Sequence, residues 1–248
     1  MLEFEETFEG GRLDGTKWFP FYLPQWTTRK AAAARYRLGD GRLTLLIEED
    51  QPPWAPDLEG GLRVSSLQTG LFAGPAGSRI GQHGRGAVVR EEQPEMRLYT
   101  PQYGRIEMRA KATDDPNCMV ALWMIGFEDA PERSAEICVA EIFGRDVGAG
   151  EARIGMGLHP FGDPGITDDF TAETLALDAR EFHVYAADWA PDHVSFSVDG
   201  VHVRTVNQSP AYPMQLMLGI YEFQPGGTYP KEFTVDYVRG YSPPPTAR

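Results

Sequence analysis

The 248-residue sequence predicts an all-β fold built from two packed antiparallel sheets. Its 27 glycines and 20 prolines separate short segments that are rich in Val, Ile, Phe, Tyr and Thr. No long window has helical periodicity, and the strand-like segments follow no repeat period. Since β-sandwiches of this length commonly form one domain, we expect a single domain over residues 1–241 and a Pro-rich tail over 242–248.

The strands are expected where such segments lie between turn signals. The clearest case is a hairpin around the two-residue turn Asp199-Gly200, a type that favours antiparallel strands. The expected strands, in chain order, are residues 42–48, 103–111, 119–125, 135–143, 154–159, 183–189, 194–198, 201–204, 215–221 and 233–241. Three long insertions, at 50–62, 72–97 and 160–180, are dense in Gly, Pro or Asp, and loops of this length commonly build binding clefts.

Charge and composition exclude several classes of function. The net charge of −13 disfavours a nucleic-acid partner, which requires clustered cations, whereas a neutral polysaccharide is compatible with it. No apolar run is long enough to span a membrane, and the first residues do not resemble a signal peptide. We therefore expect a soluble monomer that acts inside the cell or is exported by a signal outside this sequence.

The most informative segment is residues 136–141, Glu-Ile-Cys-Val-Ala-Glu, which sets two carboxylates five residues apart in an expected strand. Two carboxyl groups that flank a sugar linkage are the minimum for glycoside hydrolysis, one as proton donor and one as nucleophile or base. The alternative interpretation is a chance pair of surface glutamates, which an acidic chain provides many times over.

A regular strand would place Glu136 and Cys138 on one face and Glu141 on the other, with the apolar side chains. Burying an unpaired carboxylate among apolar residues is costly. One extra residue, a β-bulge near Val139-Ala140, would return Glu141 to the face of Glu136. The sequence therefore predicts a bulge and two glutamates on one open face.

At this point the segment resembles the signature of glycoside hydrolase family 16, the laminarinase and lichenase group, whose bulged form reads Glu-Ile-Asp-x-x-Glu. The resemblance extends in order through residues 103–110, 121–126, 182–189 with 198–200, and 235–239. It implies a concanavalin A-like β-jelly roll with a glycan cleft on its concave face. It also implies that Glu136 is the nucleophile and Glu141 the general acid/base of a retaining reaction, without a catalytic cofactor.

The same resemblance points to β-1,3-linked or mixed-linkage glucan as the substrate, with other β-linked polysaccharides open, and to an extracellular setting. The sequence departs from the family at Cys138, where the signature has an aspartate. We expect Cys138 to be a buried, neutral thiol at the catalytic site, which lowers the pKa of a neighbouring glutamate and gives an acid-shifted or weaker enzyme. A disulfide with Cys118, counted as nearly opposite across a hairpin, is a less favoured alternative, as is a nucleophilic cysteine.

Aromatic and polar residues near the expected cleft are candidate sugar contacts, with ordinary core packing as the alternative for each. The aromatic candidates are Trp26, Trp54, Trp123, Tyr22, Tyr99 and Tyr221. The polar candidates are His159, which resembles a histidine in laminarinase clefts, Glu222 and Gln215. Asp236, the Gly41 carbonyl and the acidic segment around Glu6 resemble a structural calcium site that many members carry on the convex face.

Two other functions remain open on the sequence. A non-catalytic glycan-binding module would keep the fold and the cleft, with Cys138 as a sign of lost catalysis. A transglycosylase would use the same two glutamates and differ in how well its site excludes water.

Overall fold

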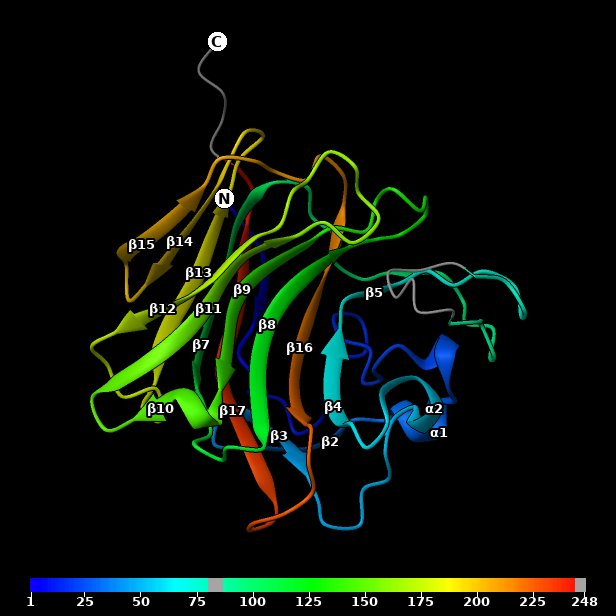
Figure 1. Cartoon of the computed structure of the whole chain (residues 1–248), viewed down its shortest axis with the longest axis horizontal. Coiled ribbons are helices and arrows are strands. Elements are labelled where there is room, and N and C mark those ends of the chain that lie inside the picture. Colours follow the sequence, from blue (N-terminus) through cyan, green and yellow to red (C-terminus); the bar gives the residue numbers. More distant parts are fainter. Residues whose placement is uncertain (80–86, 244–248) are drawn as a thin grey trace.

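In the computed structural model, residues 1–79 and 87–243 are described, and they form two large antiparallel sheets packed face to face (Figure 1). This confirms the predicted jelly-roll sandwich. The Pro-rich tail lies outside the described residues from position 244 onward, as do residues 80–86 of the second long insertion. Within the described ranges, no helix is long and apolar enough to cross a membrane.

The first sheet of the described chain has eight strands, in the order β15-β14-β13-β7-β17-β3-β2, with β1 paired to β17. Its strands are β1 (Leu2–Glu6), β2 (Arg35–Gly39), β3 (Arg42–Ile47), β7 (Gly104–Lys111), β13 (His183–Trp189), β14 (Val194–Val198), β15 (Val201–Val206) and β17 (Lys231–Tyr241). The predicted hairpin is confirmed as β14 and β15, which pair across Asp199-Gly200.

The second sheet has seven strands in the described residues, in the order β10-β11-β9-β8-β16-β4, with β12 paired to β11. Its strands are β4 (Arg63–Gln68), β8 (Cys118–Gly126), β9 (Glu136–Phe143), β10 (Val147–Gly148), β11 (Glu151–His159), β12 (Asp169–Leu175) and β16 (Met214–Glu222). The short strands β5 (Gly70–Leu71) and β6 (Met96–Arg97) pair with each other. The short helices are α1 (Arg29–Ala32), α2 (Pro56–Glu59), η1 (Pro24–Trp26) and η2 (Gly144–Asp146).

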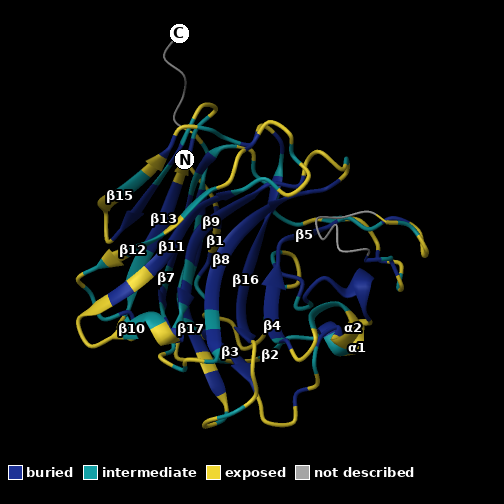
Figure 2. Ribbon diagram, viewed as in Figure 1, coloured by how far each residue is buried: buried dark blue, intermediate teal, exposed yellow. Residues whose placement is uncertain are grey.

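Apolar side chains from both sheets fill the space between them and form the main core. A second apolar cluster covers the opposite face of the second sheet, where chain segments around α1 and α2 lie beside β4 (Figure 1). Figure 2 shows that β4, β8, β9 and β16 are buried along most of their length, whereas β12 and β15 are largely exposed or half-buried. The second sheet is therefore covered on its outer face over β4, β8 and β16, and the neighbouring strand β9 carries the carboxylate pair.

Candidate active site

Strand β9 contains the predicted bulge. Ala140 pairs with Leu122 of β8, and Cys138 pairs with the next residue, Trp123, so Val139 has no partner of its own. The register with β11 shifts at the same place. The bulge prediction is thus confirmed, and it follows from the cost of pressing a carboxylate into the core.

The bulge lets the apolar side chains of β9 lie on one face of the strand and its two glutamates and cysteine on the other. Four apolar side chains enter the core between the sheets: Ile137, Val139, Ala140 and Ile142. Glu136, Cys138 and Glu141 share the other face, as the contacts of both glutamates with the same sulfur atom show. The Sγ atom of Cys138 lies 3.9 Å from Oε2 of Glu136 and 3.6 Å from Oε1 of Glu141.

Cys138 is fully buried between the two carboxylates. Burial raises the pKa of its thiol well above the usual range, and the nearby negative charges of Glu141 and Glu136 raise it further. The group is therefore a neutral thiol, whose single S–H donates a weak hydrogen bond to one carboxylate at a time, and this argues against a nucleophilic role. Cys138 lies opposite Trp123 in the pairing of β8 with β9, and both cysteines are free. The prediction that Cys118 lies nearly opposite Cys138, on which the disulfide alternative depended, was therefore wrong.

Glu141 is half-buried and has the electrostatics of a proton donor. Burial raises the pKa of its carboxyl group, while His159 and the hydrogen bond from Cys138 lower it. A raised pKa keeps a carboxylic acid protonated closer to neutral pH, which general-acid catalysis requires. Glu136 is more deeply buried, with 7% of its surface exposed.

His159 lies directly opposite Glu136 in the pairing of β11 with β9. Its Nδ1 atom is 2.7 Å from Oδ1 of Asp168, and its ring stacks on Phe170 with centroids 4.8 Å apart. The structure thus brings His159 to the carboxylates, as expected. Asp168 and Phe170 were missed because segment 160–180 reads as a loop, whereas its second half forms β12 along the edge of β11.

Trp123 and Tyr221 form an aromatic pair beside the carboxylates. Nε1 of Trp123 donates a hydrogen bond to the hydroxyl of Tyr221 across 2.9 Å, and Tyr22 meets the Tyr221 ring edge-on at 5.5 Å. The charges of Glu136 and Glu141 contribute to the raised pKa of Tyr22, after burial and Tyr221, so this ring is also close to the pair. These aromatics line the site but are buried. Trp123 and Tyr22 are each 6% exposed, and Tyr221 is 4% exposed.

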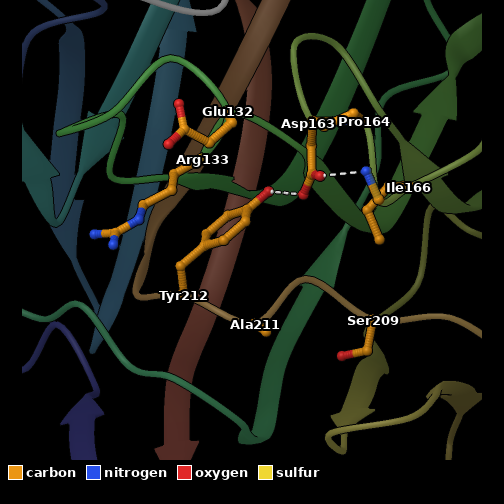
Figure 3. A pocket seen from close by; sticks show the side chains of 9 residues that line it. Glu132, Arg133, Asp163, Pro164, Ile166, Ser209, Ala211 and Tyr212 are labelled. Atoms are coloured by element: carbon orange, nitrogen blue, oxygen red, sulfur yellow. Dashed lines mark hydrogen bonds between the residues drawn. The ribbon is translucent and has the colours of Figure 1, made fainter.

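A surface pocket lies at the start of β9, lined by Glu132, Arg133, Asp163, Pro164, Gly165, Ile166, Ser209, Ala211 and Tyr212 (Figure 3). The Tyr212 hydroxyl donates to Oδ2 of Asp163 at 2.6 Å and accepts from the backbone nitrogen of Ala135 at 3.0 Å. Because Ala135 precedes Glu136, this hydrogen bond helps to fix the position of the chain where β9 begins. Tyr212 carries no sequence signal for that role.

The sequence model of the family described as Glycosyl hydrolases family 16 matches residues 98–239, more than half of the chain. The chain belongs to glycoside hydrolase family 16. The match includes β9, which holds the two carboxylates, and β11, which holds His159. This confirms the family indicated by the sequence.

Among its relatives is glucan endo-1,3-β-glucosidase A1 from Niallia circulans, which is 24% identical over 97% of this chain. The chain spans 37% of that protein's length. A GlcNAcα1-4Gal-releasing endo-β-galactosidase from Clostridium perfringens is 29% identical, with a TM-score of 0.83 over 96% of this chain and 62% of that one. The laminarinase from Flavobacterium sp. UMI-01 is 20% identical, with a TM-score of 0.68 over 98% and 100%, and supports the fold.

Two predicted sugar platforms of this family 16 chain are buried in the second apolar cluster. Trp26 and Trp54 are 1% and 2% exposed, and they pack among Tyr22, Leu23 and other loop residues. Neither tryptophan offers a ring face on which a sugar could stack. The prediction that they are platforms is corrected, because the two loops that carry them fold onto the outer face of β4 and bury them.

Three further predicted contacts are engaged elsewhere. Glu222 is completely buried, with Oε2 3.2 Å from Nη1 of Arg63 and Oε1 accepting from Tyr229 at 2.8 Å. Tyr99 stacks on Phe4 at 4.5 Å, against the core between the sheets. Both are structural residues.

Gln215 is also buried, although it shares the outer face of β16 with Met217 and Tyr221. Its Nε2 atom lies 3.4 Å from Oε1 of Gln68. In the conformation described, it presents no group to a sugar.

The residues present do not fit the expected calcium site. Asp236 forms ion pairs with Arg109 and, at 3.6 Å, with Arg42. Glu6 accepts a hydrogen bond from the backbone nitrogen of Phe8 at 2.9 Å and lies 3.7 Å from the ammonium group of Lys17. Gly41 is in the β2–β3 turn, where an added Cβ would meet a carboxylate oxygen of Glu9 at 2.7 Å. Cationic side chains therefore already neutralise the two carboxylates.

Proposed function

We propose that this chain is a retaining, endo-acting hydrolase of β-linked polysaccharide. The observation that carries the proposal is the bulge of β9, which sets Glu136 and Glu141 on one face, with both carboxylates within 3.9 Å of the Cys138 sulfur. Retaining glycosidases hold their two carboxyl groups about 5 to 5.5 Å apart, and inverting ones about 6.5 to 9.5 Å. Two groups gathered around one sulfur atom are compatible with the shorter spacing.

In the first step, the Glu136 carboxylate attacks the anomeric carbon while Glu141 gives its proton to the leaving glycosidic oxygen. The product is a glycosyl ester of Glu136. In the second step, the Glu141 carboxylate takes a proton from water, and the resulting attack on the ester releases the sugar with its original configuration. The raised pKa of Glu141 supports its assignment as the acid/base.

For the substrate, we propose β-1,3-linked or mixed-linkage glucan, in line with the Niallia circulans relative. A second candidate is an internal β-galactoside linkage. It is favoured because the endo-β-galactosidase structure has a higher sequence identity to this chain, and a higher TM-score, than the Flavobacterium laminarinase has. The chain spans less than two thirds of both the glucosidase and the galactosidase, so each substrate is a hypothesis to be tested directly.

The test is the release of reducing ends from laminarin, mixed-linkage β-glucan, β-galactan and a GlcNAcα1-4Gal-capped glycan. Glu136→Gln and Glu141→Gln should each reduce the rate by about 100-fold or more, because each removes a catalytic group. Glu151→Gln, at an exposed position of β11, is the matched control and should retain full activity. Equal, background-level release by all four proteins would favour a glycan-binding module instead.

The stereochemistry of added azide assigns the two roles. With Glu136→Ala, azide should attack from the face that the nucleophile leaves free and give the inverted, α-configured glycosyl azide. With Glu141→Ala, azide should attack the covalent intermediate and give the β-configured product. The opposite assignment of products would exchange the two roles. Products longer than the donor chain would identify a transglycosylase.

A further inference from the structure

The cysteine that replaces the family's aspartate completes a set of metal-ligand atoms. One carboxylate oxygen of Glu136, the Cys138 sulfur and a ring nitrogen of His159 all lie within 4.8 Å of one another. Carboxylate, thiolate and imidazole are the three protein ligand types of zinc. We propose that the catalytic site of this chain binds a thiophilic divalent cation such as Zn²⁺ through Glu136, Cys138 and His159, and that the bound ion blocks hydrolysis.

The geometry is close to that of a tetrahedral site. Zinc bonds of about 2.0 Å to nitrogen or oxygen and about 2.3 Å to sulfur place neighbouring ligand atoms roughly 3.3 to 3.6 Å apart. The Cys138 sulfur is already 3.9 Å from Oε2 of Glu136, and a solvent molecule would complete the four-coordinate shell. Contraction of the cluster by about 1 Å, through side-chain rotation, would enclose the ion.

His159 has the kind of carboxylate partner that a metal-bound histidine usually has. Asp168 lies 2.7 Å from its Nδ1 atom, and this hydrogen bond leaves the lone pair of Nε2 free in the neutral ring. A carboxylate on the far nitrogen is the usual partner of a metal-bound histidine, and it makes the imidazole a better donor. The Phe170 ring, stacked at 4.8 Å, restricts rotation of the imidazole.

Cys138 gives the site its selectivity. With an aspartate at that position, the ligands would be oxygen and nitrogen only, whereas a thiolate favours zinc, cadmium and similar soft ions over magnesium or calcium. On binding, the thiol gives its proton to solvent and coordinates as thiolate. The ion reaches the buried thiol from the side of His159, whose side chain is 30% exposed.

The inhibitory part of this proposal rests on the proposed function, since an ion held by Glu136 occupies the nucleophile. The binding part does not, so it is tested first and without a substrate. Reduced, chelator-stripped protein is titrated with Co²⁺, which mimics zinc and is coloured. The expected result is one equivalent bound, with a near-ultraviolet thiolate-to-cobalt charge-transfer band and visible bands of tetrahedral intensity.

Cys138→Ser should abolish the charge-transfer band, and Cys118→Ser should retain it, because Cys118 lies at the far end of β8, opposite Glu222. Addition of Zn²⁺ should displace the cobalt and remove the band. Absence of the band from the wild-type protein, or its persistence in Cys138→Ser, would overturn the proposal. Circular dichroism of each variant checks that it is folded.

Asp168→Asn tests the orientation of His159 and should weaken zinc affinity by about 10- to 100-fold, the usual effect of losing such a partner. For inhibition, Zn²⁺ should suppress hydrolysis by the wild type, and Cys138→Asp should require at least about 10-fold more. A cobalt band with no hydrolysis of any glycan would support the metal site and reject the enzyme. Hydrolysis that zinc does not inhibit, together with no cobalt band, would support the enzyme and reject the metal site.

Discussion

Cys138 acts on its neighbours through hydrogen bonds rather than charge. Its neutral thiol lies between Glu136 and Glu141, and its hydrogen bond lowers the pKa of Glu141 against the upward effect of burial. An aspartate at this position would act in the opposite direction, because a negative charge beside a carboxyl group raises the pKa of that group. The substitution therefore sets the pH range over which Glu141 holds its proton.

We predict that Cys138→Asp moves the alkaline limb of the kcat/KM profile to higher pH. The introduced carboxylate removes a hydrogen-bond donor and adds a negative charge, both of which raise the pKa of Glu141. The acid then stays protonated at a higher pH, and activity near neutrality increases. The measurement is a pH profile on the best glycan, with Cys118→Ser as the control, and an unchanged profile would contradict this account.

Tyr221 is predicted to support the site through Trp123. Tyr221→Phe removes the acceptor 2.9 Å from Nε1 of a tryptophan that is 6% exposed. An unsatisfied buried donor costs about 1 to 3 kcal/mol, so the free energy of unfolding should fall by that amount. Urea unfolding measures it, and Tyr36→Phe, at an exposed position of β2, should change it by less than about 0.5 kcal/mol. Equal effects of the two substitutions would show that the hydrogen bond has no net value.

At the scale of the element, the bulge of β9 decides which face of the strand the side chains after it point to. Two residues, Val139 and Ala140, stand between Cys138 and Glu141, where a regular strand would need one to keep both on the same face. Removing one of the two should give a regular strand in which Glu136, Cys138 and Glu141 still share a face. A deletion anywhere else between the glutamates should not.

We predict that deletion of Ala140 leaves the protein folded, with measurable activity and a loss of about 1 to 2 kcal/mol for one buried methyl group and its surroundings. Deletion of Ile137 is the matched control, since it keeps the bulge but turns Glu136 into the core between the sheets, where an unpaired charge is costly. Thermal unfolding and hydrolysis should separate the two variants. If neither variant folds, the bulge has a further structural role.

The strands that could be predicted from the sequence are those with a marked apolar run or alternation between turn residues. The predicted strand 183–189 coincides with β13, and the limits of β3, β8 and β16 agree with the prediction within one residue at each end. Strand β12 was missed, because its Asp-, Thr- and Glu-rich sequence lies half-exposed at the sheet edge and carries little apolar contrast. Missing it also concealed Asp168 and Phe170, the partners of His159.

At the scale of the whole molecule, sequence reasoning worked for residues whose surroundings are set by their own strand. Glu136, Cys138 and Glu141 could be placed because alternation along β9 decides where they point. Trp26 and Trp54 could not, because their burial depends on two distant loops that fold onto the same sheet face. No local pattern distinguishes a tryptophan that lines a cleft from one that fills it.

The ion pairs of the first sheet lead to a prediction about calcium. Arg109 and Arg42 already neutralise Asp236, and Lys17 lies beside Glu6, so a bound cation would have to displace these partners. An ion present at 100 times its Kd would add about 2.7 kcal/mol, or roughly 5 to 10 °C in Tm for a domain of this size. We expect calcium and a chelator to give melting temperatures within about 2 °C of each other, which lies well below that shift. A rise of the larger size, lost in Asp236→Asn, would establish the calcium site and show that the arginines move aside to admit it.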